Sequence, residues 1–211
     1  MIKVLVADPH IIVHKGIKAV FRNSTEISII GKVTNDVDIY DYLDENHVDI
    51  VIMELDFSSV DGLSILKRIK KEFPSVRVLI FTGQPEEVYA ISSLKAGASA
   101  YLNKSAPTGY IRDAILKISS GGVYITNQLA QSIAFDETTG NPRRRFSKLS
   151  MREVEVLKML CSGKRNKKIA FELGINEKTV STYRSRIMKK LKVRNLVELI
   201  RRAQSMHIET F

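Results

Sequence analysis

The sequence predicts an α/β chain: a five-stranded, doubly wound parallel-sheet domain, then a linker, then an all-α four-helix domain. Over about the first 120 residues, short β-branched runs alternate with longer stretches of helical spacing, which favours repeated β-α units. From residue 149 onward the apolar spacing is helical throughout. Residues 147–211 hold 16 Lys and Arg against 6 Asp and Glu, whereas residues 1–146 hold 17 of each. A neutral first part and a basic second part indicate a regulatory domain joined to a domain that binds a polyanion.

The predicted strands are buried on both faces. Runs such as Val4–Val6 and Val51–Met53 are continuously apolar, which is typical of parallel strands covered by helices on both sides. We expect strands at 2–7, 27–33, 49–53, 76–81 and 99–102, and helices at 10–22, 36–46, 61–72, 86–96 and 107–119. The working site of such a sheet lies at the carboxyl ends of the strands. Those ends fall at residues 8–10, 54–59, 82–83 and 103–105.

The domain boundaries follow from composition. We place the first domain at 1–122, a linker at 123–146 and the basic domain at 147–211. Residues 127–146 lose their periodicity and include Gly140, Asn141 and Pro142, so we interpret them as an irregular linker. Arg143–Arg145 could enter a DNA minor groove, but their position in the linker favours a solvated segment.

The basic domain carries clear helix signals. Ser150 and Glu153 predict a capping box at the start of its first helix, and a second helix covers about 165–173. Asn176 is a suitable N-cap for a third helix that reaches Leu191, and a fourth helix covers 195–205.

The spacing of Ala170, Gly174 and Val180 indicates a helix-turn-helix. A small residue allows close approach of two helices, glycine supplies the turn, and the β-branched residue fixes the second helix to the core. Short hydroxyls on the third helix can approach base edges, and the cations can neutralise phosphates. The candidate DNA-binding residues are Lys167, Lys168, Lys178, Thr179, Ser181, Thr182, Arg184, Ser185, Arg186 and Lys189. The alternative is a solvated four-helix domain with basic side chains on its surface.

Several classes of protein are disfavoured. No apolar run approaches the ~20 residues that span a bilayer, and Met1–Ala7 lacks the pattern of a signal peptide. Cys161 is the single cysteine, which excludes an intramolecular disulfide and a Cys-rich metal site. The first domain has no Walker or GxGxxG phosphate loop. We therefore expect a cytoplasmic protein that is not an enzyme and has no cofactor, no bound metal and no membrane partner.

Two resemblances cover nearly the whole chain. Residues 149–157, 166–170, 178–187 and 190–191 closely resemble the LuxR-type DNA-binding domain, and the first domain resembles a response-regulator receiver. Together they are similar to the NarL/FixJ family of bacterial response regulators. This resemblance implies a flavodoxin-like receiver and a tetrahelical output domain whose third helix enters the major groove. It also implies that a homodimer binds double-stranded promoter DNA, with the helix at 195–205 as the output-domain dimer contact and RNA polymerase as a further candidate partner.

The receiver departs from its family at two positions. Such receivers take a phosphoryl group on an Asp after the third strand and hold Mg²⁺ with an acidic pair after the first strand. Here the pair is Asp8-Pro9 and the acceptor position is Glu54. The other two functional positions of the pocket hold the residue types that the family uses. Tyr101 occupies the position of the family's switch aromatic residue. The resemblance thus implies a degenerate phosphoacceptor pocket made of Asp8, Pro9, Glu54, Thr82 and Lys104.

These departures change the chemistry that we expect. Proline offers no side-chain oxygen to a metal, and Glu54 projects its carboxylate one methylene further than Asp does. We expect phosphoryl transfer to be absent or very weak, and Glu54 to reach toward Lys104 and Thr82 and favour an active-like state. The leading hypothesis is a phosphorylation-independent regulator. The alternatives are a conventional two-component regulator that a histidine kinase phosphorylates, and an interaction module whose receiver docks on other proteins.

Three further side chains near the strand ends need an interpretation. Asp56 could serve as another acceptor, but we expect it to point away from the pocket. His10 and His14 have the spacing of two metal ligands on a helix, yet no third ligand is evident. We therefore expect an ordinary surface or capping role for both histidines.

Overall fold

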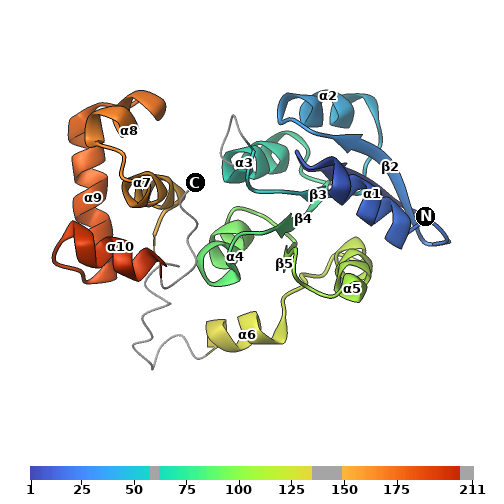
Figure 1. Ribbon diagram of the computed structural model, residues 1–211. Helices are drawn as coiled ribbons and strands as arrows, with labels where there is room; N and C mark the ends of the chain where they lie inside the picture. Colours follow the sequence, from blue (N-terminus) through green and yellow to red (C-terminus); the bar gives the residue numbers. More distant parts are fainter. Residues whose placement is uncertain (58–61, 135–148, 205–211) are drawn as a thin grey trace. The chain divides into compact units, whose positions relative to one another are not determined.

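The structure is a computed structural model that describes residues 1–57, 62–134 and 149–204. The chain divides into two compact units, and Met1–Glu86 and Ser93–Ile133 make up the first (Figure 1). The second unit contains the C-terminal helices. None of the described helices combines the length and the apolar character that a membrane span requires.

The first unit is a parallel sheet in the order β2-β1-β3-β4-β5. Its strands are β1 (Ile2–Ala7), β2 (Ile27–Val33), β3 (Ile50–Met53), β4 (Arg77–Thr82) and β5 (Ala100–Asn103). The first five helices are α1 (Ile11–Val20), α2 (Val37–Glu45), α3 (Gly62–Glu72), α4 (Glu86–Lys95) and α5 (Thr108–Ser119). Every strand begins and ends within one residue of its predicted position, so the prediction of a doubly wound five-stranded sheet is confirmed.

Burial on both sides holds this sheet in place. On one face, Ile17 and Phe21 of α1 and Ile115 of α5 pack against Val4 and Ile52 of the strands. Successive strand residues point to opposite faces, so the equally buried neighbours of these strand residues face the other helical layer. Each such buried aliphatic side chain stabilises the fold by about 1.5–3 kcal/mol.

The topology brings four strand ends to one edge. All strands are parallel, and the chain crosses between β1 and β3 at the centre of the sheet, where the strand order reverses. The residues that follow β1, β3 and β5 therefore lie near one another, as does the last residue of β4.

The prediction of an irregular linker is wrong for its first part. Residues 127–134 form α6 (Asn127–Ala134). The Thr126 hydroxyl accepts a hydrogen bond from the backbone N–H of Leu129 (3.1 Å), and the Leu129 side chain is buried. Leu129 is the one buried residue among the α6 side chains that the structure describes, and such a signal is too weak to be recognised from the sequence. Residues 135–146, which include Arg143–Arg145, lie outside the described residues.

Four helices lie within residues 149–204, as predicted. They are α7 (Met151–Cys161), α8 (Asn166–Glu172), α9 (Glu177–Leu191) and α10 (Leu196–Gln204). The capping box of Ser150 and Glu153 is formed, and the Asn176 side chain accepts from the backbone N–H of Thr179 at 2.7 Å. Gly174 has φ +62°, the left-handed conformation that ends α8 and favours glycine.

Candidate functional site

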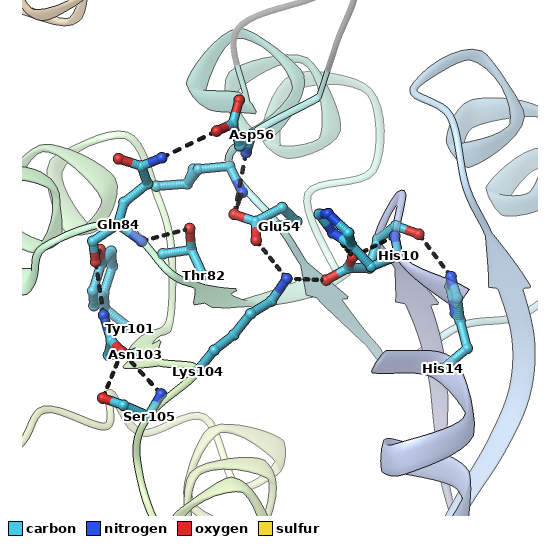
Figure 2. Close-up of polar contacts among 12 residues, drawn as sticks. His10, His14, Glu54, Asp56, Thr82, Gln84, Tyr101, Asn103, Lys104 and Ser105 are labelled. Atoms are coloured by element: carbon cyan, nitrogen blue, oxygen red, sulfur yellow. Dashed lines mark hydrogen bonds and ion pairs between the residues drawn. The ribbon is translucent and has the colours of Figure 1, made fainter. Parts of the chain in front are cut away.

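One lysine lies between two buried carboxylates at the carboxyl edge of the sheet (Figure 2). Lys104 Nζ is 2.6 Å from Asp8 Oδ2 and 2.6 Å from Glu54 Oε2. The side chains of Asp8 and Glu54 are only 3% and 4% exposed, and that of Lys104 is 22% exposed. We call these three residues the Lys104 triad. Two carboxylates share one ammonium, so the triad carries one net negative charge when all three groups are ionised.

Opposite influences act on the pKa of Lys104. Burial by itself lowers it, because a low-dielectric surrounding disfavours the charged form. The hydrogen bonds and charges of Asp8 and Glu54 outweigh burial and raise the pKa of Lys104 above its usual value. The lysine is therefore cationic throughout the neutral range.

Glu54 uses both of its carboxylate oxygens. While Oε2 contacts the lysine, Oε1 accepts hydrogen bonds from the backbone N–H groups of Leu55 (2.6 Å) and Asp56 (3.1 Å). The expected contact with Thr82 is not among the hydrogen bonds of the described residues. The Thr82 hydroxyl instead accepts from the backbone N–H of Gln84 at 3.2 Å. The carboxylate turns back on its own chain, and this leaves Thr82 to the following loop.

Two histidines contact Asp8. Its Oδ1 accepts from the backbone N–H of His10 at 2.8 Å and lies 3.0 Å from the His10 ring. His14 Nε2 donates to the backbone carbonyl of Asp8 at 2.7 Å. His10 is at the surface, as expected, but His14 is buried, so the expectation of a surface or capping role is wrong for His14. It lies three residues before the buried Ile17, on the inner face of α1.

A second layer of hydrogen bonds joins the loop after β4 to its neighbours (Figure 2). The Gln84 side-chain amide donates to Asp56 Oδ2 at 3.1 Å. The Gln84 carbonyl accepts from the Tyr101 hydroxyl (2.9 Å) and from Asn103 Nδ2 (3.0 Å). The Tyr101 side chain is fully buried, so the predicted switch aromatic lies inside the domain.

The second unit presents hydroxyls and cations along α9. Val180 and Ile187 on the opposite face are fully buried and fix the helix to the core. Of the candidate DNA-binding residues, all are exposed except the half-buried Thr179 and Arg184. Within residues 149–204 the structure pairs none of the candidate Lys and Arg side chains with a carboxylate. Their charge is therefore available to an external anion.

Three of the predicted hydroxyls already have partners within the unit. Thr179 donates to Asn176 Oδ1 (2.9 Å) as part of the helix cap, and Thr182 donates to the carbonyl of Lys178 (3.0 Å). Ser181 donates to the Glu177 carbonyl (3.1 Å) and accepts from the Asn166 side chain (3.2 Å). A hydroxyl retains acceptor lone pairs after it donates, so Thr182 can still accept a bond from a base or a water.

A buried carboxylate anchors α9 to α7. Glu153 Oε2 lies 2.6 Å from Lys190 Nζ and accepts from the backbone N–H of Ser150, also at 2.6 Å. Burial alone raises the pKa of Glu153, but the Lys190 ammonium and the Ser150 N–H outweigh burial and hold it below its usual value. The sequence identified Glu153 as a capping residue but not its partner, which lies 37 positions away.

Comparison with known proteins decides the family. Residues 4–116 match the family of response regulator receiver domains, and residues 147–203 match the bacterial regulatory proteins of the luxR family. The chain is 34% identical over 197 residues to the Fimbriae Z protein of Escherichia coli K12, with 93% of each chain covered. It is 30% identical over 203 residues to the response regulator UvrY of the same strain, covering 94% of this chain and 92% of UvrY. The chain belongs to the LuxR-type response regulators.

A solved structure gives the same fold assignment. RcsB of Salmonella enterica serovar Typhimurium, solved on promoter rprA with a phosphomimetic BeF3⁻, superimposes with a TM-score of 0.76. The two chains are 24% identical, and the match covers 97% of this response regulator and all of RcsB. The protein is thus a DNA-binding transcriptional regulator, as the LuxR-type motifs in its sequence predicted.

Sequence reasoning missed Gln84 of this response regulator, and it placed Asn103 at a strand end without assigning it a role. Both act through a backbone carbonyl or a side-chain amide, and no motif of the sequence distinguishes them from ordinary loop residues. Their positions gave the one available signal, since Gln84 follows β4 by two residues and Asn103 ends β5. Polar residues there face the same edge as the Lys104 triad.

Proposed function

We propose that this response regulator controls transcription without being phosphorylated, through a receiver whose acceptor position is held by Glu54. The observation that carries the proposal is the occupancy of the Glu54 carboxylate. One oxygen is paired with Lys104 and the other accepts two backbone N–H groups. A carboxylate must present a free oxygen in line with the phosphorus to act as a nucleophile, and positioning dominates this reaction. Glu54 meets neither condition in this arrangement.

The residues present do not fit the Mg²⁺ ion on which receivers of this family rely. Octahedral Mg²⁺ needs oxygen ligands at nearly fixed distances, and Pro9 supplies no side-chain oxygen. The Asp8 carboxylate already accepts from Lys104 and from the His10 backbone. An ammonium sits between the two carboxylates that would approach the metal, and no cluster of three or more metal-binding side chains occurs among the described residues.

The Lys104 triad supports an active-like receiver in the absence of phosphate. A phosphoryl group on the acceptor would place negative charge next to Lys104, and the Glu54 carboxylate does so here at 2.6 Å. The buried Tyr101 accords with that state, because its hydroxyl is bonded to the loop that follows β4. Glu54 is an imperfect mimic, since it carries less charge and fewer acceptor oxygens than a phosphoryl group.

The output domain would bind promoter DNA as a homodimer through α9. The exposed, unpaired cations of α8 and α9 can neutralise phosphates, and the exposed Thr182 and Ser185 can approach base edges in the major groove. RcsB, whose fold the chain shares, has been solved on promoter DNA and as DNA-bound dimers. We assign the domains as 1–122 and 147–211, with α10 of the second as the dimer contact.

A conventional regulator is the second candidate, because RcsB was solved on DNA with a phosphomimetic. Intact-mass spectrometry after incubation with acetyl phosphate separates the two. We expect no added phosphoryl mass on the natural chain or on Glu54→Asp, which still lacks the second acidic residue. The double variant Pro9→Asp with Glu54→Asp should gain the mass and serves as the positive control.

The opposite outcome is equally specific. Added mass on the natural chain that disappears in Glu54→Ala or in Asp56→Ala would assign phosphorylation to that carboxylate. The hypothesis of a conventional two-component regulator would then hold. Sedimentation of the untreated protein at micromolar concentration tests the dimer. A strict monomer that dimerises only with acetyl phosphate would contradict the proposal.

A further inference from the structure

A path of hydrogen bonds leads from the Lys104 triad to Tyr101 through two residues outside the triad (Figure 2). The Asp56 backbone N–H donates to Glu54 Oε1 at 3.1 Å. The Asp56 carboxylate accepts from the Gln84 side-chain amide at 3.1 Å, and the Gln84 carbonyl accepts from the Tyr101 hydroxyl at 2.9 Å. The first bond lies within the segment after β3, and the other two join that segment to the loop after β4 and that loop to β5.

Gln84 holds the loop between β4 and α4 at three points. Its backbone N–H donates to Thr82, its carbonyl accepts from Tyr101 and Asn103, and its side chain reaches Asp56. These contacts tie the loop to the segment after β3, to the end of β4 and to β5. A loop position fixed in three directions has little freedom to move while all three remain.

Tyr101 depends on where that loop lies. Its ring is fully buried, and a buried phenol hydroxyl is unfavourable unless it is hydrogen-bonded. The Gln84 carbonyl is a backbone atom, so it meets the hydroxyl only while the loop is held in this position. The hydrogen bond from the Gln84 amide to the Asp56 carboxylate is charge-assisted and therefore stronger than a bond between neutral groups. It fixes the loop from the side of Glu54.

We infer that Asp56 and Gln84 are positioning residues that link the Glu54–Lys104 pair to Tyr101 and keep the β4–α4 loop in place without a phosphoryl group. The inference rests on the proposed function, because such a link replaces phosphate only in a receiver that works without it. The link has a direction: Glu54 fixes the Asp56 backbone, Asp56 fixes the Gln84 amide, and Gln84 places the acceptor for Tyr101.

The test follows the ring of Tyr101 by ¹⁹F NMR in the full-length protein labelled with 3-fluorotyrosine. Tyr101→Phe assigns the resonance among the seven tyrosines of the chain. Gln84→Ala removes the tether to Asp56 but leaves the carbonyl that Tyr101 uses. We expect it to shift or split the Tyr101 resonance, and Asp56→Ala to do the same from the other side of the bond. Asp56→Asn keeps an acceptor oxygen and should restore the natural resonance.

Two further measurements separate a link from general loosening. Glu54→Ala should shift the Tyr101 resonance in the natural background and add no further shift in Gln84→Ala. Asn35→Ala is the matched control, because Asn35 donates a similar amide–carboxylate bond to Asp38 (2.7 Å) on the surface between β2 and α2. That change should leave Tyr101 unaffected.

An unchanged Tyr101 resonance in Gln84→Ala or in Asp56→Ala overturns the inference, as does an equal shift in Asn35→Ala. Fully additive shifts from Glu54→Ala and Gln84→Ala also overturn it, because they would act on Tyr101 separately. The proposed function fails on another readout, the gain of phosphoryl mass from acetyl phosphate. The two ideas can therefore be refuted independently.

Discussion

Replacing Lys104 by Met should destabilise the first domain severely. Both carboxylate oxygens lie 2.6 Å from the same nitrogen, so they are at most 5.2 Å apart. At that separation two unit charges repel by about 3 kcal/mol at an effective dielectric constant of about 20. Removing one partner from a buried ion pair costs about 3–5 kcal/mol in general, which agrees with this value. We therefore expect the free energy of unfolding to fall by about 3–5 kcal/mol.

Hydrogen exchange of the buried amides of β1 and β3 measures this loss, because it reports the unfolding of the first domain alone. Lys15→Met is the control: Lys15 is an exposed lysine of α1, and its loss should change stability by less than about 0.5 kcal/mol. Adding Glu54→Gln to Lys104→Met should recover most of the loss. Glutamine removes one of the two facing charges, and its oxygen can still accept from the Leu55 and Asp56 N–H groups. A loss below about 1 kcal/mol, or no recovery in the double variant, would refute the reasoning.

The difference in the free energy of unfolding between the natural chain and Lys104→Met should depend on pH in a defined direction. The pKa of Lys104 is raised in the folded state, so its contribution is fully present below the ordinary lysine pKa of about 10.4. It is lost as pH rises through the higher pKa of the folded state. The difference between the natural chain and Lys104→Met should thus stay constant near neutrality and narrow above about pH 10.4.

The remaining predictions concern the output domain. On a duplex DNA of fixed length, Lys189→Ala should weaken binding to all sequences and reduce the slope of log K against log salt by about 0.9, whereas Thr182→Ala should change sequence preference and leave the slope unaltered. Glu153→Ala should cost about 1–3 kcal/mol in urea unfolding, because Lys190 and the Ser150 N–H both lose their acceptor. Glu153→Gln should cost less. Burial raises the pKa of Cys161 to about 11, so a thiol-specific disulfide reagent at neutral pH should modify it at least about 100-fold more slowly than the urea-unfolded chain.

The sheet could be predicted well because each strand is recognisable from its own local residue pattern. Continuous apolar runs such as Val4–Val6 require cover on both faces, and no tertiary information is needed to recognise them. The candidate site followed from the same logic, since parallel strands place their carboxyl ends together. Lys104 lies 2.6 Å from both Asp8 and Glu54 for that reason. The helix caps at Ser150 and Asn176 were equally local.

The sequence could not predict hydrogen bonds that depend on the direction in which a side chain turns. Glu54 has the reach for Thr82, but two backbone N–H groups at 2.6 and 3.1 Å compete successfully for its second oxygen. Gln84 acts partly through a backbone carbonyl, which every residue possesses, so its identity carries little signal. Helix α6 was missed because, among its described side chains, Leu129 alone marks a buried side. In each case the outcome depends on tertiary contacts that no local pattern encodes.

Both domains contain a buried glutamate that pairs with a lysine, but the balance of charge around the pair differs. In each, a buried glutamate accepts from backbone N–H groups and pairs with a lysine from a distant element at 2.6 Å. The output domain has one carboxylate for one lysine, so Glu153 and Lys190 neutralise each other and fix α9 rigidly. The receiver has two carboxylates for one lysine, and that surplus negative charge makes its geometry depend on the cation. The balanced pair therefore lies where α9 is fixed against α7. The unbalanced triad lies at the carboxyl edge of the sheet, where its surplus negative charge leaves the segments after β1 and β3 dependent on Lys104.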